Sequence, residues 1–230
     1  MSPLLLVLSR PTARVLEDAA ALGDWRLSAP EEERMSRLQR SADRDDFLAA
    51  HLLVRICAAR VLDLRPEEVS IVQHCPTCGG PHGRPELDGH PEVGVSLAHS
   101  RGVVAAAAGT VPVGVDVEAF PAAGGLAAGD LSAALTAAEM AAIDSAPDPG
   151  RAVLLAWARK EACLKAGLVD LDGLDGFDLS ALPLGPPPGG LVPRSVVHGS
   201  WAVHDWWDGR AGAIGVVVAP AGARLTLAGA

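Results

Sequence analysis

The residues best suited to chemistry gather near position 160. Only two of the 19 lysines and arginines are lysine, and both, Lys160 and Lys165, fall within Trp157–Lys165. Lysine presents a compact charge that can approach a single oxygen or lose a proton, whereas arginine presents a broad, permanently charged fork. Chance clustering is the alternative explanation. We interpret this segment as one that takes part in a reaction.

Glu161 and Lys165 lie four residues apart in residues 151–166, whose pattern predicts a helix ending near Gly167. This spacing places both side chains on one helical face. The simplest interpretation is that Glu161 and Lys165 form an ordinary ion pair on the protein surface. A carboxylate beside an ammonium group can also accept a proton or hold a metal ion, while the ammonium group neutralises a phosphate.

A second acidic pair lies in residues 113–118 (VGVDVE). In a strand, Asp116 and Glu118 share one face and the valines between them face the core. Two adjacent carboxylates repel each other unless a cation or proton lies between them, and Mg²⁺ commonly takes such ligands together with substrate phosphates. Alternatively, Asp116 and Glu118 are ordinary acidic residues on the solvent-exposed face of an edge strand. Likewise, His99 in an expected turn is either a phosphate donor or a plain turn residue.

These segments resemble the two signature motifs of the 4'-phosphopantetheinyl transferases. Residues 113–118 resemble G-[IV]-D-x-E, and residues 157–165 resemble [FW]-x-x-K-E-[AS]-x-x-K, in the same order along the chain. Residues 82–85 are similar to the family's G-[KR]-P segment, and residues 96–100 to its [NS]-[IL]-S-H-S segment. The resemblance covers about residues 30 to 170, and the chain length suits the two-lobed, Sfp-like type.

The resemblance implies an α+β fold of two similar α/β lobes, residues 1–112 and 113–230, related by a pseudo-twofold. It implies an enzyme that moves the 4'-phosphopantetheine group of coenzyme A to a serine of an apo carrier protein and releases adenosine 3',5'-bisphosphate. Coenzyme A would lie between the lobes. Asp116, Glu118 and Glu161 would hold Mg²⁺ against the pyrophosphate. Glu161 would also activate the serine, and Lys165 would neutralise the developing charge.

The same resemblance implies contacts to coenzyme A. His99 would meet the 3'-phosphate and Arg84-Pro85 the adenine end. Four further cations are candidate contacts: Arg34, Arg37, Arg40 and Lys160. The alternative for the three arginines is a solvated helical face. Two positions depart from the family pattern. Ala98 replaces a serine before the histidine, and Asp45-Asp46 stands where relatives often carry basic or hydroxyl residues, which leaves the 3'-phosphate ligands open.

The elements that must position these residues can be predicted in outline. Helices are expected after the Ser28 cap, over about residues 43–62, after the Thr136 cap and over residues 151–166. Strands are expected over residues 4–8, 69–73 and 93–96. Residues 103–108 and 113–118 are expected to form one hairpin, and residues 201–207 and 213–218 another. A loop is expected over residues 121–130. Strands and helices do not alternate regularly, which favours α+β over a doubly wound sheet.

Charge and composition restrict the partners. A net charge of −9 argues against a nucleic-acid-binding protein and against binding to anionic membranes. We find no apolar run long enough for a membrane span, and Leu4–Leu8 is too short for a signal segment. Four cysteines are too few for a disulfide scaffold, so we expect a cytoplasmic protein. The resemblance to the two-lobed type implies a monomer. The acyl, peptidyl and polyketide carriers of fatty-acid, nonribosomal-peptide and polyketide synthesis are all possible partners.

Two alternatives to catalysis remain open. One is a catalytically silent homologue that only binds carrier proteins, although the four residues of the acidic and lysine motifs are all present. The other is a zinc-knuckle interaction module built on Cys75 and Cys78. That pair supplies two of the four ligands of a structural zinc, and His74 and His82 lie too close in sequence to complete the site easily.

Overall fold

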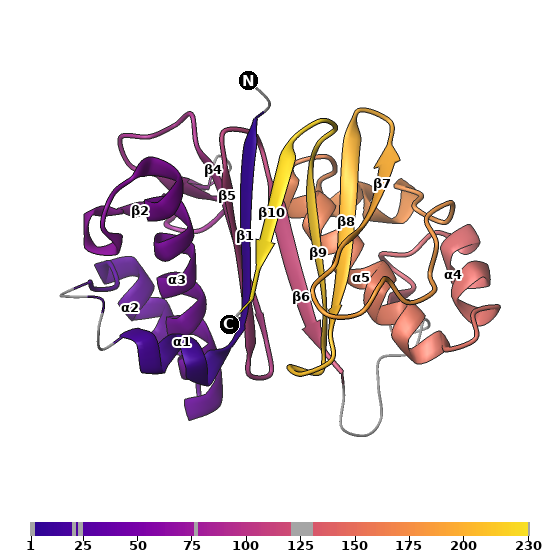
Figure 1. The fold of residues 1–230 in the computed structure, drawn as a ribbon, viewed down its shortest axis with the longest axis horizontal. Helices are drawn as coiled ribbons and strands as arrows, with labels where there is room; N and C mark the ends of the chain where they lie inside the picture. Colours follow the sequence, from indigo (N-terminus) through magenta and orange to yellow (C-terminus); the bar gives the residue numbers. More distant parts are fainter. Residues whose placement is uncertain (1–2, 20–21, 23–24, 76–77, 121–130, 230) are drawn as a thin grey trace.

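The computed structural model describes residues 3–19, 22, 25–75, 78–120 and 131–229. The expected loop over residues 121–130 lies outside them. The described chain is α+β, as predicted. It contains two four-stranded sheets that lie next to each other, each with helices on its outer side (Figure 1).

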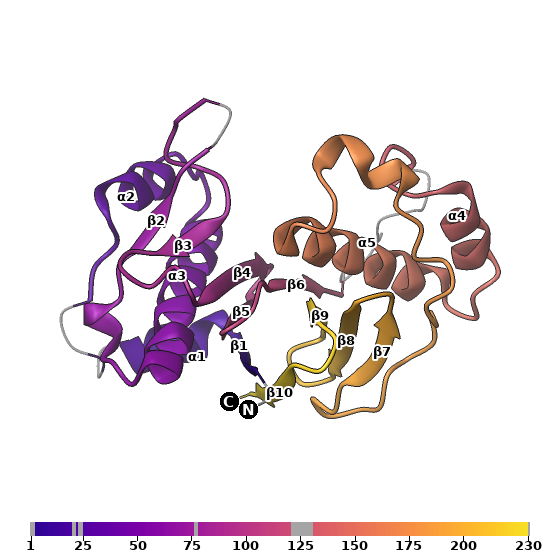
Figure 2. The same cartoon turned by 90° about the horizontal axis from the view of Figure 1, so that it is seen from above.

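The first sheet contains strands from both ends of the chain. Its order is β10 (Arg224–Ala228), β1 (Leu4–Pro11), β5 (Val103–Gly109) and β4 (Gly94–Ser100). β1 runs antiparallel to β5 and β5 antiparallel to β4, whereas β10 lies parallel to β1. The N- and C-termini are therefore neighbours (Figure 2).

One long helix, α3 (Ser41–Leu62), covers the outer face of this sheet. Alternate residues of β1 and β5 face it, and the alanines of β5 leave room for its close approach. Two shorter helices precede it, α1 (Thr12–Ala19) and α2 (Ala29–Ser36). The α3 helix leads through η1 (Pro66–Glu68) to a small hairpin, β2 (Ile71–Gln73) and β3 (Pro85–Leu87).

A buried carboxylate fastens α2 to α3. Glu31 closes the expected capping box with Ser28 and also lies 2.7 Å from both His51 Nδ1 and Arg55 Nη2. Burial alone would raise the pKa of Glu31, but hydrogen bonds to His51 and Arg55 lower it to about 2. The ionised network holds α2, which lines the cavity described below, against α3. These helices, the first sheet and the β2–β3 hairpin make up the first half of the molecule.

The second sheet is entirely antiparallel. Its order is β6 (Gly114–Ala119), β9 (Ala213–Pro220), β8 (Trp201–Asp208) and β7 (Arg194–His198). Its outer face packs on α5 (Pro149–Ala166), which α4 (Ala137–Asp144) precedes and η3 (Leu171–Gly176) follows. As predicted, Thr136 caps α4, and α5 ends at Gly167 with φ +82°. The second sheet with α4 and α5 makes up the second half of the molecule.

The two sheets share an apolar core, and two serines join them at β4 and β6. Leu5 and Val7 of the first sheet pack in one cluster with Val115 and Val117 of the second. Ser96 Oγ accepts a hydrogen bond from Val115 N at 3.0 Å, and Ser100 Oγ accepts one from Ala119 N at 3.3 Å. These hydroxyls hold the acidic strand β6 against the first half of the molecule.

The hairpin expected over residues 103–118 is wrong. β5 pairs with β1 and β4, whereas β6 pairs with β9, almost a hundred residues later in the chain. The true hairpin is β4–β5, which turns at Arg101-Gly102, where both φ angles are positive. His99 and Ser100 consequently belong to the end of β4 and not to the turn. The predicted terminal hairpin is confirmed as β8–β9.

Candidate active site

A cavity of about 810 Å³ opens where the two halves meet. It takes side chains from α2, α3, β4 and the segment before β3 on one side, and from β6, α5 and the start of η3 on the other. The lining residues with charged or imidazole groups are Arg34, His51, Arg84, His99, Asp116, Glu161, Lys165 and Asp170.

The two sequence motifs meet at Lys165. Its Nζ lies 2.7 Å from Asp116 Oδ1 and 4.0 Å from Glu161 Oε2. Asp116 is almost fully buried, while Glu161 and Lys165 are partly exposed to the cavity. Asp116, Glu161 and Lys165 therefore lie close together at the cavity.

Gly114 explains how the strand comes this close to the helix. A Cβ atom added there would overlap the peptide oxygen of Ala162 and the peptide nitrogen of Ala166 in α5. β6 therefore packs directly on the backbone of α5, the close approach for which glycine is suited. Asp116, two residues further on, is brought to the Glu161 and Lys165 face of the helix.

The buried carboxyl group of Asp116 lies in an electrostatic environment that disfavours its charged form. Burial, reinforced by Glu118 and Glu161 and opposed by Lys165, raises the pKa of its carboxyl to about 7. Its second oxygen, Oδ2, is buried and has no hydrogen-bond partner within the part of the chain that the structure describes. An orphaned carboxylate oxygen with two further carboxylates in its field favours an additional cation.

Glu118 lies slightly apart from Asp116 and Glu161. Ser100 Oγ donates to Glu118 Oε2 at 2.8 Å, and the side chain of Trp157 forms a second hydrogen bond to the carboxylate. Burial raises the pKa of Glu118, and these hydrogen bonds oppose it. The side chain does not line the cavity, and among the described residues the oxygens of the three carboxylates do not lie within 4.8 Å of one another.

The opposite wall is cationic. His99 lines it from the end of β4, and the surrounding protein partly desolvates its ring, which lowers its pKa although the residue is exposed. Arg84 and Pro85 line it from the start of β3, and the Arg84 guanidinium packs against Gly167 at the end of α5. This contact crosses from one half to the other and places a cation at the negative end of the α5 dipole.

Arg34, one of the three arginines considered for the 3'-phosphate, lines the cavity. It extends from α2 over the ring of Phe47, with Cζ 5.6 Å from the ring centroid. Its Nε is buried and has no hydrogen-bond partner among the described residues. A buried guanidinium donor without an acceptor suits an anionic ligand.

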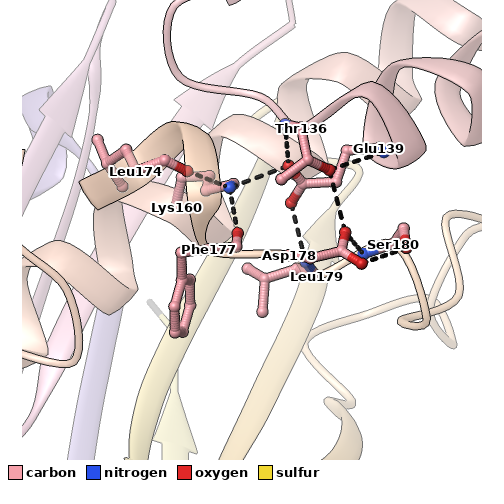
Figure 3. A network of polar contacts seen from close by, with 8 residues as sticks. All are labelled: Thr136, Glu139, Lys160, Leu174, Phe177, Asp178, Leu179 and Ser180. Atoms are coloured by element: carbon pink, nitrogen blue, oxygen red, sulfur yellow. Dashed lines mark hydrogen bonds and ion pairs between the residues drawn. The ribbon is translucent and has the colours of Figure 1, made fainter. Parts of the chain in front are cut away.

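Lys160 is not at the cavity, contrary to expectation. The side chain is fully buried, with Nζ 2.9 Å from Glu139 Oε2 and 2.7 Å from the carbonyl oxygen of Leu174, and it also donates to the Phe177 carbonyl (Figure 3). Glu139 itself accepts hydrogen bonds from Thr136 N and Leu179 N. Lys160 therefore ties α4, α5 and the η3 segment together. This structural role accounts for a lysine at position 160 without a bound ligand.

Arg37 and Arg40 do not reach the cavity either. Arg37 is exposed and paired with Glu33, and Arg40 is exposed at the N-cap of α3. Asp46, which departs from the family pattern, has a structural role: it accepts hydrogen bonds from Thr12 Oγ1 and, at 3.0 Å, from Gly102 N. It ties α3 to the β4–β5 turn next to His99.

A comparison with known protein families gives a match to the second half of the chain. Residues 112–206 match the sequence profile of the 4'-phosphopantetheinyl transferase superfamily. Over these residues the chain is similar to members of this superfamily. The matched segment runs from just before β6 into β8 and includes both acidic residues of the strand motif and the Glu161–Lys165 pair. It therefore supports an enzyme of the phosphopantetheinyl-transferring type.

A comparison with curated proteins finds no match for the chain. No helix in the part that the structure describes has both the length and the apolar character to cross a bilayer.

Proposed function

We propose that the chain transfers 4'-phosphopantetheine from coenzyme A to a serine of an apo carrier protein and releases adenosine 3',5'-bisphosphate. The observation that carries this proposal is the cavity between the halves. There the superfamily's acidic and lysine motifs face a cationic wall from the other half of the chain. A ligand with several phosphates at one end and a reacting pyrophosphate fits this distribution of charge.

The cationic wall would hold the nucleotide end of coenzyme A. We assign the 3'-phosphate to His99, with Arg34 as an added ligand whose Nε has no hydrogen-bond partner in the described part of the chain, and the adenine end to Arg84 and Pro85. We choose Arg34 from the four candidate cations because the side chains of Arg37, Arg40 and Lys160 are engaged elsewhere or exposed outside the cavity.

In the reaction, the carrier serine Oγ attacks the β-phosphorus, which bears the pantetheine arm. A new P–O bond forms, and the bond from that phosphorus to the bridging oxygen breaks, so that adenosine 3',5'-bisphosphate leaves with the electron pair. Glu161 is partly exposed in the cavity and would accept the serine proton, directly or through water. Lys165 would neutralise the charge that develops on the phosphates.

The donor set fits a divalent cation. Asp116 has an orphaned buried oxygen, and Glu118 and Glu161 lie near enough to raise its pKa. Oxygen ligands of this kind suit Mg²⁺, and we propose Asp116, Glu118 and Glu161 as its protein ligands. Mg²⁺ bound there would neutralise the pyrophosphate. Lys165 now occupies the neighbourhood of Asp116 Oδ1, so binding of the ion and movement of Lys165 would be coupled.

We also propose that the two halves are related by a pseudo-twofold, as in the Sfp-like type, with a boundary at residues 112–113. In both halves the first strand pairs antiparallel with the last hairpin strand, and a long helix packs outside: β1, α3, β4 and β5 in one, β6, α5, β8 and β9 in the other. A cytoplasmic monomer acting on acyl, peptidyl or polyketide carriers remains our expectation.

The proposed activity is tested by incubating the chain with coenzyme A, Mg²⁺ and a panel of apo carrier proteins, and measuring the intact mass of each carrier. We expect the mass of the phosphopantetheine arm on at least one carrier. Glu161→Gln should abolish the addition, whereas Glu92→Gln, at an exposed glutamate outside the cavity, should not. After EDTA treatment, Mg²⁺ added without zinc should restore activity.

Two results would contradict the proposal. No added mass on any carrier, despite carrier binding in a pull-down, would favour the silent homologue. Full activity of Glu161→Gln would remove that residue from the reaction, and activity indifferent to EDTA would remove the metal role of Asp116 and Glu118.

A further inference from the structure

Two cysteines and one histidine converge at the tip of the β2–β3 hairpin. The ligand atoms of Cys75, Cys78 and His82 all lie within 4.8 Å of one another, and Cys78 Sγ lies 3.0 Å from His82 Nε2. No other group of three potential metal ligands as compact as this occurs among the described residues. The sequence argument took His82 as too near to the cysteines, but the tight turn folds it back onto Cys78.

These separations suit one tetrahedral zinc ion. With Zn–S and Zn–N bonds of ordinary length, two ligand atoms on the same ion lie about 3.5 to 3.8 Å apart. A small movement of the side chains therefore places three donors around a common point. Thiolate and imidazole are the donors that select zinc over Mg²⁺, so this site differs in chemistry from the carboxylate site in the cavity.

The backbone around the cluster is shaped to bring the donors together. Gly79, with φ +71°, donates from its N–H to the Cys75 carbonyl at 2.8 Å, and Cys75 N donates to the Gly80 carbonyl at 2.9 Å. A Cβ atom at Gly80 would lie 3.1 Å from the His82 ring and 3.2 Å from Cys78 Sγ. Any larger residue there would push the two ligands apart.

We propose that Cys75, Cys78 and His82 bind one Zn²⁺, with solvent as the fourth ligand. Apart from Cys75, these groups are exposed, and the described residues of the loop, 74–75 and 78–84, belong to none of the buried apolar clusters. A metal cross-link is a common means of fixing so short a segment, since binding of the ion replaces the missing burial.

The zinc site adjoins the cavity. His82 is followed directly by Gly83-Arg84-Pro85, three cavity-lining residues, and Gln73 Nε2 donates to the Gly83 carbonyl at 2.7 Å. Arg84 then reaches across to Gly167. The ion would thus fix the loop that carries Arg84 into the cavity, so we expect a positioning role for the zinc ligands. This consequence rests on the proposed function, whereas zinc binding itself does not.

The first test is metal content. The full chain, expressed with zinc in the medium and purified without chelators, should contain about one zinc per chain by plasma mass spectrometry. Cys78→Ser and His82→Ala should each lower the content at least five-fold. His90→Ala, which removes a partly exposed histidine from the same half, should leave it unchanged. Zinc below one tenth per chain in the unaltered protein would overturn the proposal, as would equal zinc in Cys78→Ser.

A second readout separates zinc from a disulfide. Intact mass under native purification should show both thiols retained, and thiol modification should release zinc to a colorimetric chelator. A mass of the metal-free, denatured chain that is lower by two hydrogen atoms, a difference abolished in Cys78→Ser, would show an oxidised Cys75–Cys78 disulfide and overturn the zinc site. In the transfer assay, His82→Ala should raise the KM for coenzyme A several-fold with little change in kcat. Loss of zinc with an unchanged KM would overturn the positioning role alone.

Discussion

The two lysines of the chain illustrate what residue type and spacing can predict. Their scarcity drew attention to the correct helix, but it did not separate Lys165, which lines the cavity, from Lys160, which is buried beside Glu139. Five residues turn a helix by about 140°, so the two side chains point in different directions. Helical geometry applied to the sequence would have excluded Lys160 from the site, because Glu161 and Lys165 lie on one face of the helix and Lys160 lies on another.

A contrast between the two lysines follows. Lys165→Met should reduce turnover on the order of a hundred-fold or more, because it removes the cation next to Asp116 and the phosphates. Lys160→Met should instead lower the free energy of unfolding by about 3 to 5 kcal/mol, because it leaves Glu139 buried without its counter-ion. Urea unfolding and the carrier mass assay on both variants check this.

Each variant serves as the control for the other, since both remove the same ammonium group from the same helix. The assignment fails if Lys165→Met unfolds as easily as Lys160→Met, or if Lys160→Met keeps the stability of the unaltered chain. Residual activity of folded Lys160→Met should remain well above that of Lys165→Met.

Other residue assignments needed the structure. Arg34, Arg37 and Arg40 are alike in sequence, yet Arg34 alone of the three lines the cavity, because the relative rotation of α2 on α3 decides which arginine faces inward. That rotation depends on Glu31 and its buried partners, His51 and Arg55, which are twenty or more residues away. Such distant pairing leaves no local signal.

At the scale of elements, local signals predicted helices better than strand pairing. Capping residues and periodicity located the helices that begin near Thr136 and end at Gly167. They also suggested a hairpin of β5 with β6, since two apolar segments are separated by a Gly-Thr turn. The partner of β6 is instead β9, and sequence patterns do not encode which of several apolar strands will pair. The acidic strand was therefore found, but not its neighbours.

Gly114 offers a test of how tightly the strand and the helix must fit. Gly114→Ala should lower the free energy of unfolding by about 3 kcal/mol or more, because its Cβ would overlap the α5 backbone, which cannot move aside as a side chain can. The same displacement would draw Asp116 away from Lys165, so turnover should fall even where the protein is still folded. Thermal unfolding and the carrier mass assay measure the two effects.

Gly176→Ala is the matched control, because a Cβ atom there meets nothing within 4 Å and the backbone is not in the left-handed region. Its stability and turnover should match those of the unaltered chain. If Gly114→Ala behaved like Gly176→Ala, direct packing of β6 on α5 would not be what sets the distance between the two motifs.

At the scale of the whole molecule, the last strand belongs to the first sheet. β10 lies parallel to β1, so that Leu225 pairs with Leu5 and Leu227 with Val7, and both leucines pack against the core between the sheets. The alternation of residues 224–228 fits a strand, but its partner lies at the other end of the chain. We did not predict β10 from the sequence, and nothing local to that segment indicates where it pairs.

Because β10 closes the first sheet, weakening it should affect the whole structure and not only the C-terminal end. Leu225 and Leu227 are partly buried, so changing both to alanine should lower the free energy of unfolding by roughly 2 to 4 kcal/mol. Arg224→Ala, on the exposed face of the same strand, should cost less than about 0.5 kcal/mol. The transition is followed by fluorescence in one background that keeps only Trp25, in the first half, and in another that keeps only Trp206, in the second. A single urea transition that shifts equally in both would show that the sheets unfold together. Separate transitions, with the Trp206 signal unmoved, would show that the shared core does not couple them and that the cavity between them is not rigidly framed.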